Sequence, residues 1–138
     1  SQLSPKFKNL DWISMHYAED PKKEFENLKL VMKKINEDKR EKMIISHYQF
    51  FSAILNDNFN NLNRWYTNDN NSYPLKNHKY FKFYEEHLLE NILKNDIEVI
   101  YTIGDPNFED YKVYLKNICF DKLNLNTITD IYKIKNCN

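Results

Sequence analysis

The tripeptide Ser46-His47-Tyr48 holds the side chains best suited to catalysis in this chain. It follows a short apolar run at residues 43–45, which predicts a buried strand. Open α/β sheets usually bind ligands at the carboxyl ends of their strands, so His47 stands where a general base could act. Because no nucleophile stands beside it and no second histidine has metal-ligand spacing, we expect neither a catalytic residue nor a metal site. In the alternative interpretation, Ser46 caps the next helix and His47 forms local hydrogen bonds.

Two further groups of side chains could hold a ligand. Arg64-Trp65-Tyr66 combines a guanidinium, which binds oxyanions through paired hydrogen bonds, with aromatic faces that pack on sugars. Asp105 follows a predicted strand and could contact ligand hydroxyl groups. Each has a structural alternative, since Arg64 and Trp65 can tie down a loop and an aspartate before Pro106 is common turn chemistry. With these alternatives open, the candidate ligand-binding residues are His47, Tyr48, Arg64, Trp65, Tyr66 and Asp105.

The elements that must position these side chains are organised around residues 80–105. The first half of this stretch repeats apolar residues with helical period, in a stripe formed by Phe81, Tyr84, Leu88 and Ile92 and widened by Leu89 and Leu93. A β-branched run from Ile97 to Ile103 follows and is apolar on both faces, which predicts a central strand. A helix that leads into an interior strand is the unit of an α/β sheet.

Similar patterns predict the other elements of a single domain spanning residues 1–138. Asp20-Pro21 starts a helix, because aspartate can cap and proline fits the first helical position. The charged run at residues 36–42 is expected to be a solvated helix end, and residues 56–77 a long polar loop. The remaining predictions are a strand at 43–46, short helices after it and after residue 108, and a closing hairpin of residues 119–125 and 129–135. The predicted fold is α/β, a small three-layer sandwich with a mostly parallel sheet and a C-terminal β-hairpin.

The composition limits the classes of function. The chain of 138 residues has 20 basic and 20 acidic side chains, so its net charge gives no reason to expect nucleic acid as a partner. A single glycine argues against a P-loop or a dinucleotide-binding fingerprint, and we expect no cofactor. No apolar run reaches the ~20 residues that cross a bilayer, so the piece itself is expected to be soluble. Its start at Ser1 suggests a piece of a longer protein.

The two cysteines, Cys119 and Cys137, fall on the two arms of the predicted hairpin. A turn near Ile128 would place them opposite each other, where a disulfide is geometrically allowed. Such a bridge would stabilise the fold by roughly 3 kcal/mol in the chain-entropy model. The alternative is a pair of reduced cysteines in a cytosolic protein, and the spacing does not choose between them. Two cysteines without a nearby histidine pair do not make a zinc site.

Several segments together resemble a known class of membrane protein. In order they are KMIISHYQFFSAIL, NRWY, SYPLKNHKYFKFYEEHLLENILKNDIEVIYTIG, NICF and IYKIKNC. This order is similar, over roughly residues 20 to 137, to the C-terminal soluble region of bacterial polytopic membrane proteins of the dolichyl-phosphate-mannose mannosyltransferase type. In such proteins the membrane helices and their first loops carry the catalytic acid and the binding of acceptor and lipid-linked sugar. The soluble tail is an α/β module on the extracytoplasmic side.

The resemblance implies an accessory role at the periplasmic face of the inner membrane. The membrane-embedded part of the same chain would be its partner, with a glycan or a lipid-linked sugar as a further candidate. No catalytic residue is carried onto this sequence, because the corresponding motif would lie upstream. The implied compartment also favours a bridge between Cys119 and Cys137.

Two hypotheses therefore follow, with a purely structural interaction module as a third. The first is a non-catalytic extracytoplasmic domain of a membrane glycosyltransferase-like protein, which predicts an uncovered apolar or aromatic surface patch. The second is a small stand-alone α/β enzyme or ligand-binding domain, cytoplasmic if the resemblance does not hold. It predicts that His47, Arg64 and Asp105 converge on one pocket.

Overall fold

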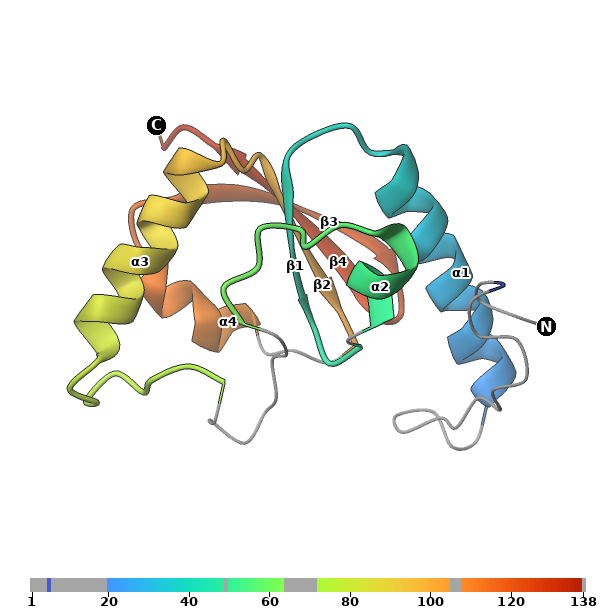
Figure 1. Cartoon of the computed structure of the whole chain (residues 1–138), viewed down its shortest axis with the longest axis horizontal. Coiled ribbons are helices and arrows are strands. Elements are labelled where there is room, and N and C mark those ends of the chain that lie inside the picture. The colour runs from blue at the N-terminus through green and yellow to red at the C-terminus, as the bar shows by residue number, and fades with distance from the viewer. Residues whose placement is uncertain (1–4, 6–19, 49, 64–71, 105–107, 138) are drawn as a thin grey trace.

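The computed structural model describes residues 5, 20–48, 50–63, 72–104 and 108–137 (Figure 1). In chain order the elements are α1 (Pro21–Glu37), β1 (Lys42–Ser46), α2 (Phe50–Leu55), α3 (Phe81–Lys94), β2 (Val99–Ile103), α4 (Phe108–Tyr111), the 3₁₀ helix η2 (Lys112–Tyr114), β3 (Cys119–Asn126) and β4 (Thr129–Lys135). Within these described ranges, no helix is long and apolar enough to cross a membrane.

The strands form one four-stranded sheet in the order β1-β2-β4-β3. β1 and β2 are parallel, whereas β4 is antiparallel to both β2 and β3. The α/β class and the C-terminal hairpin are thereby confirmed, but the sheet is mixed where a mostly parallel sheet was predicted. The reason is that the closing hairpin itself completes the sheet, and strands joined by a tight turn must run antiparallel.

Helices cover both faces of the sheet, which gives the predicted three layers. On one face α1 and α2 pack over alternate residues of β1 and β2, with a core that includes Leu28, Phe51, Ile44 and Tyr101. On the other face α3, α4 and η2 pack over the intervening residues, with a core that includes Leu88, Tyr111, Met43 and Ile100. All five residues of β2 are buried, so the prediction of a central strand covered on both sides is confirmed.

The helix α1 begins as its sequence predicts. The side chain of Asp20 accepts a hydrogen bond from the backbone N–H of Lys23, at 3.0 Å, and Pro21 occupies the first turn. The stripe of α1 that faces the sheet is buried and includes Phe25, Leu28, Val31, Met32 and Ile35. α1 is therefore fixed against the sheet by its own periodicity.

The helix α3 buries a narrower stripe than predicted. Leu88 and Ile92 are buried, but Leu93 is 76% exposed. Successive residues of an α-helix are separated by about 100° around the axis, so Leu93 points well away from the direction of Ile92. The prediction that Leu93 widens the buried stripe is wrong.

The hairpin brings the two cysteines together. Cys119 and Cys137 are joined by a disulfide, with their Cα atoms 5.2 Å apart. The strand register differs from the prediction, because Cys119 pairs with Lys135 and Cys137 lies beyond the end of β4. Two features account for the difference: the turn is centred between Thr127 and Ile128 and not on Ile128, and a register shift between Asn124 and Asn126 moves the pairing by one further residue. The bridge thus ties the segment after β4 back to the start of β3.

Candidate functional site

The carboxyl ends of β1 and β2 lie side by side, as expected for a parallel pair. Ser46 pairs with Ile103 at this edge, and His47, Tyr48 and Gly104 come directly after the two strands. Gly104 has a φ of +91°, and a Cβ atom there would lie 3.3 Å from both the His47 and the Tyr48 ring. Glycine is therefore needed at this position both for its backbone conformation and for the space it leaves.

A buried carboxyl group from α1 completes this edge. Glu24 is only 1% exposed, and its Oε1 accepts a hydrogen bond of 2.5 Å from the hydroxyl of Tyr48. The other oxygen, Oε2, is buried and has no hydrogen-bond partner among the residues that the structure describes. The backbone N–H of Tyr48 donates to Ser46 Oγ at 2.9 Å, which holds the chain in a turn after β1. The pair of Glu24 and Tyr48 connects the start of α1 with the end of β1.

Sequence reasoning missed Glu24, although a signal was present. Its position falls on the spacing of the buried stripe, four residues before Leu28 and seven before Val31. An acidic residue on such a stripe must find a hydrogen-bond donor, because burying an unpaired carboxylate is costly. Tyr48 is that donor. A buried carboxyl and a phenol in contact can exchange a proton or bind a hydroxyl group, and they can equally act as a structural link.

The structure brings together two of the predicted ligand-binding residues, His47 and Tyr48, at the edge of the sheet. The other four, Arg64, Trp65, Tyr66 and Asp105, lie outside the described residues. Their convergence with His47 on one pocket therefore stays a prediction. The structural alternative, in which Ser46 caps the next helix, is not what this bond does, because Ser46 Oγ accepts from the backbone N–H of Tyr48, which lies before the start of α2 at Phe50.

A second polar group lies at the amino end of β1. Arg40 donates two hydrogen bonds to the Asp38 carboxylate, from Nε at 2.9 Å and from Nη2 at 2.7 Å. Tyr101 of β2 donates a third, at 2.6 Å. These hydrogen bonds hold the pKa of Asp38 well below its usual range, the one from Arg40 most strongly, while burial raises the pKa of Tyr101 above its usual value.

The prediction that residues 36–42 form a solvated helix end holds for the exposed residues Asn36, Glu37, Lys39 and Glu41, but it is wrong for Asp38. The Asp38 side chain is only 6% exposed, and its carboxylate is bonded to the Arg40 guanidinium and the Tyr101 hydroxyl. Arg40 and Tyr101 both direct their donors at the Asp38 carboxylate. The arrangement is a structural ion pair that fixes the entry into β1.

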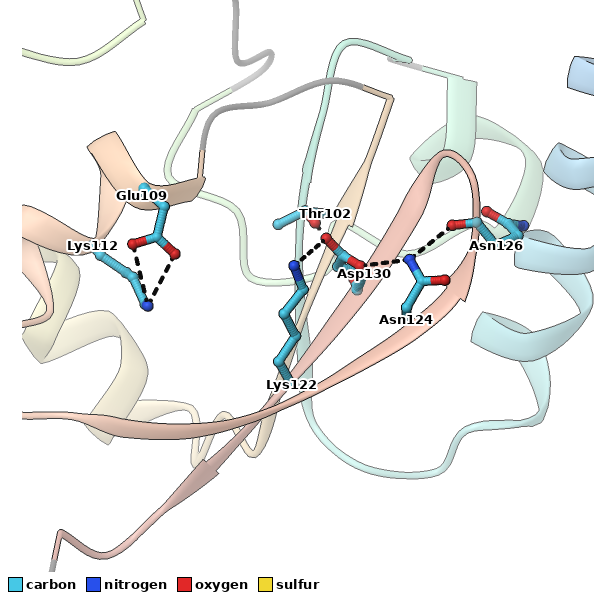
Figure 2. Close-up of polar contacts among 7 residues, drawn as sticks. All are labelled: Thr102, Glu109, Lys112, Lys122, Asn124, Asn126 and Asp130. Carbon is cyan, nitrogen blue, oxygen red and sulfur yellow. Dashed lines mark hydrogen bonds and ion pairs between the residues drawn. The ribbon is translucent and has the colours of Figure 1, made fainter.

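A third polar group lies on the hairpin (Figure 2). The Asp130 carboxylate accepts from Lys122 Nζ at 3.0 Å and from Asn124 Nδ2 at 2.9 Å. Lys122 also lies 5.7 Å from the centre of the Tyr132 ring, and the pKa of Lys122 is raised, chiefly by its hydrogen bond to Asp130. Figure 2 shows the ion pair between Glu109 of α4 and Lys112 of η2 as a separate contact. The charges are paired, so this group stabilises an edge hairpin without offering an open site.

A pocket of about 430 Å³ opens at the far end of the sheet, between α3 and the end of the hairpin. Its lining combines aliphatic residues, Ile92, Ile97, Ile118 and Ile134, with polar residues such as Asp96, Glu98 and Lys135. Cys137 of the disulfide is part of the lining. Such a pocket can accept a small apolar group. No cluster of three metal-ligating side chains occurs in the part of the chain that the structure describes.

Comparison with known proteins adds no assignment, because no family model, no curated protein and no solved structure matches this chain. Functional inference therefore rests on the residues and their geometry.

Proposed function

We propose that this chain is a non-catalytic extracytoplasmic domain of a membrane glycosyltransferase-like protein, packed against the membrane-embedded part of the same chain. The observation that carries the proposal is the disulfide between Cys119 and Cys137. Structural disulfides persist in oxidising compartments and are rare in the cytosol of mesophiles. The bridge thus supports the periplasmic location that the sequence resemblance implies.

The disulfide has a structural role suited to that location. It closes a sequence separation of 18 residues and secures the hairpin whose strand β4 pairs with the central strand β2. Closing a loop of that size stabilises a fold by roughly 3 kcal/mol in the chain-entropy model. Disulfides of this kind are common in small domains of oxidising compartments, where a small core gains from the constraint.

The polar groups described above support an accessory role. The charges of Asp38 and Arg40 neutralise each other, as do those of Asp130 and Lys122. Glu24 is buried against Tyr48 in the first turn of α1. An active site usually presents such groups unpaired at the wall of a cleft, with pKa values tuned for proton transfer. In our proposal the chemistry is supplied upstream, and this domain helps to position a glycan acceptor or a lipid-linked sugar.

The test is a topology measurement on the full-length parent protein in the bacterial inner membrane. Spheroplasts are treated with a reductant and then with a membrane-impermeant maleimide, and the matched control carries Cys119→Ser and Cys137→Ser. The proposal predicts labelling of intact spheroplasts that requires reduction and is absent from the control. Labelling that requires lysis would place the domain in the cytoplasm and overturn the proposal. Apolar spans of ~20 residues upstream of this segment are expected as well.

A second candidate is a ligand-binding domain or enzyme with a pocket near His47, Arg64 and Asp105. The observation in its favour is the buried Glu24 carboxyl beside Tyr48 at the carboxyl ends of two parallel strands, where such sites form. Saturation-transfer NMR with monosaccharides and sugar phosphates tests it. Binding that is lost in His47→Ala and Arg64→Ala, and kept in Lys112→Ala, would favour this candidate. An absence of binding in the unaltered chain would remove it.

A further inference from the structure

The turn that leads into α3 carries a surface patch that the fold itself does not use. We call it the α3 entry patch. Its apolar members are strongly exposed, with Phe83 at 69%, and they alternate with exposed lysines. Its residues are Leu75, Lys76, Lys79, Tyr80, Lys82 and Phe83. Figure 1 shows this segment at the left-hand end of the molecule, where it projects beyond the sheet.

The patch stands on a rigid base, because its neighbours in sequence are anchored in the core. Phe81 stacks on Tyr114 with ring centres 4.7 Å apart. The Tyr114 hydroxyl donates to the carbonyl of Pro74, and the Tyr73 ring packs edge-on against Tyr114 at 5.8 Å. Backbone hydrogen bonds of 2.8 and 2.9 Å close the turn between residues 75 and 81. The exposed aromatic side chains are thus held outward at little further cost in conformational entropy on binding.

The α3 entry patch is positively charged. No acidic residue occurs between Ser72 and Tyr84, a segment that contains three lysines. The next acidic residue, Glu85, forms an ion pair of 3.7 Å with Lys116. Glu86 lies 3.9 Å from Lys82, but both side chains are well exposed, so this pair neutralises the patch only weakly.

We propose that the α3 entry patch docks onto an anionic lipid bilayer. Aromatic rings flanked by lysines are the side chains found at membrane interfaces, where the ring enters the headgroup layer and the ammonium group reaches lipid phosphates. Lys79 already has its Nζ 4.9 Å from the centre of the Tyr80 ring, so ring and charge act on the same surface. The positive charge of the patch selects an anionic lipid surface over a neutral one.

This inference rests on the proposed membrane location, but its test is independent of the labelling experiment. The isolated 138-residue chain is sedimented with vesicles of phosphatidylcholine, with or without phosphatidylglycerol. We expect binding to the mixed vesicles that weakens as salt is added. Vesicle binding by a chain that proves cytoplasmic would remove the proposed compartment and leave the docking surface in place.

Paired variants assign the binding to the patch. Lys79→Gln is expected to weaken binding about fivefold. Phe83→Ser is expected to weaken binding about tenfold, because serine has no apolar ring to transfer from water into the bilayer. The controls lie at the other end of the same helix, where Lys94→Gln and Leu93→Ser change similarly exposed side chains and should leave binding unchanged.

Three results of the sedimentation experiment would overturn the inference. They are a chain that does not sediment with anionic vesicles, binding that Lys79→Gln and Phe83→Ser leave intact, and equal losses in the control variants. A dimer in solution that Phe83→Ser dissociates, without vesicle binding, would also overturn it and would assign the patch to a second copy of the chain. All four altered side chains are exposed, so circular dichroism is expected to show the native fold in every variant.

Discussion

The contact between Glu24 and Tyr48 makes the sharpest prediction for this fold. Tyr48→Phe removes only a hydroxyl group, yet it deprives a buried carboxyl of the hydrogen bond that its Oε1 accepts from Tyr48, while Oε2 has no partner within the described part of the chain. Leaving a buried polar group unsatisfied costs about 1–3 kcal/mol, and more when it is charged. Because Glu24 is 1% exposed, water cannot replace the lost donor. We expect Tyr48→Phe to lower the free energy of unfolding by about 2–3 kcal/mol.

The double variant separates this explanation from a simple loss of packing. Adding Glu24→Met to Tyr48→Phe removes the carboxyl as well and keeps a side chain of similar length. Replacing both partners of a buried hydrogen bond with apolar groups of similar shape is often nearly neutral. We therefore expect the double variant to recover most of the stability that Tyr48→Phe loses. A sum of two separate losses would contradict the account.

The assay is equilibrium unfolding in urea, followed by circular dichroism. The matched control is Tyr80→Phe, which removes a hydroxyl from an exposed ring and is expected to change stability by less than about 0.5 kcal/mol. A similarly small effect for Tyr48→Phe would refute the reasoning, because it would mean that the Glu24 carboxyl has another donor or stays hydrated in the folded state.

Three further predictions concern the rest of the fold. Reduction of the Cys119–Cys137 bridge, or replacement of both cysteines by serine, should lower the free energy of unfolding by roughly 3 kcal/mol, measured in urea with and without reductant. The pKa of Asp38 is lower in the folded state than its unfolded value of about 3.9. The contribution of the Asp38 carboxylate to the free energy of unfolding is therefore complete above about pH 3.9, and it is lost as the pH falls from there toward the folded-state pKa. Acid titration of stability should therefore be shallower in Asp38→Asn than in the unaltered chain. Gly104→Ala should cost roughly 1–2 kcal/mol, since it combines a left-handed φ with crowding against His47 and Tyr48, and an unchanged melting temperature would contradict this.

Local patterns in the sequence determined most of the elements. The start of α1 follows from Asp20 and Pro21, whose capping chemistry needs no distant partner. The arms of the hairpin were predicted within a residue of their observed ends, because alternation and turn residues act over short distances. The buried run of β2 likewise identified the centre of the sheet. These features depend on side chains that are near one another in the chain.

The tertiary structure decided what joins residues that are far apart in the chain. Pairing of β4 with β2, which makes the sheet mixed, depends on how the hairpin closes over the central strand. The register shift that moves Cys119 opposite Lys135 depends on one irregular residue in β3. Asp38 and Glu24 looked like surface charges in sequence, but both side chains are buried in the folded chain, where a tyrosine hydroxyl from another element, Tyr101 or Tyr48, donates to each carboxylate. Sequence periodicity reports which face of an element is apolar, but a buried charge depends on a partner that only the folded chain supplies.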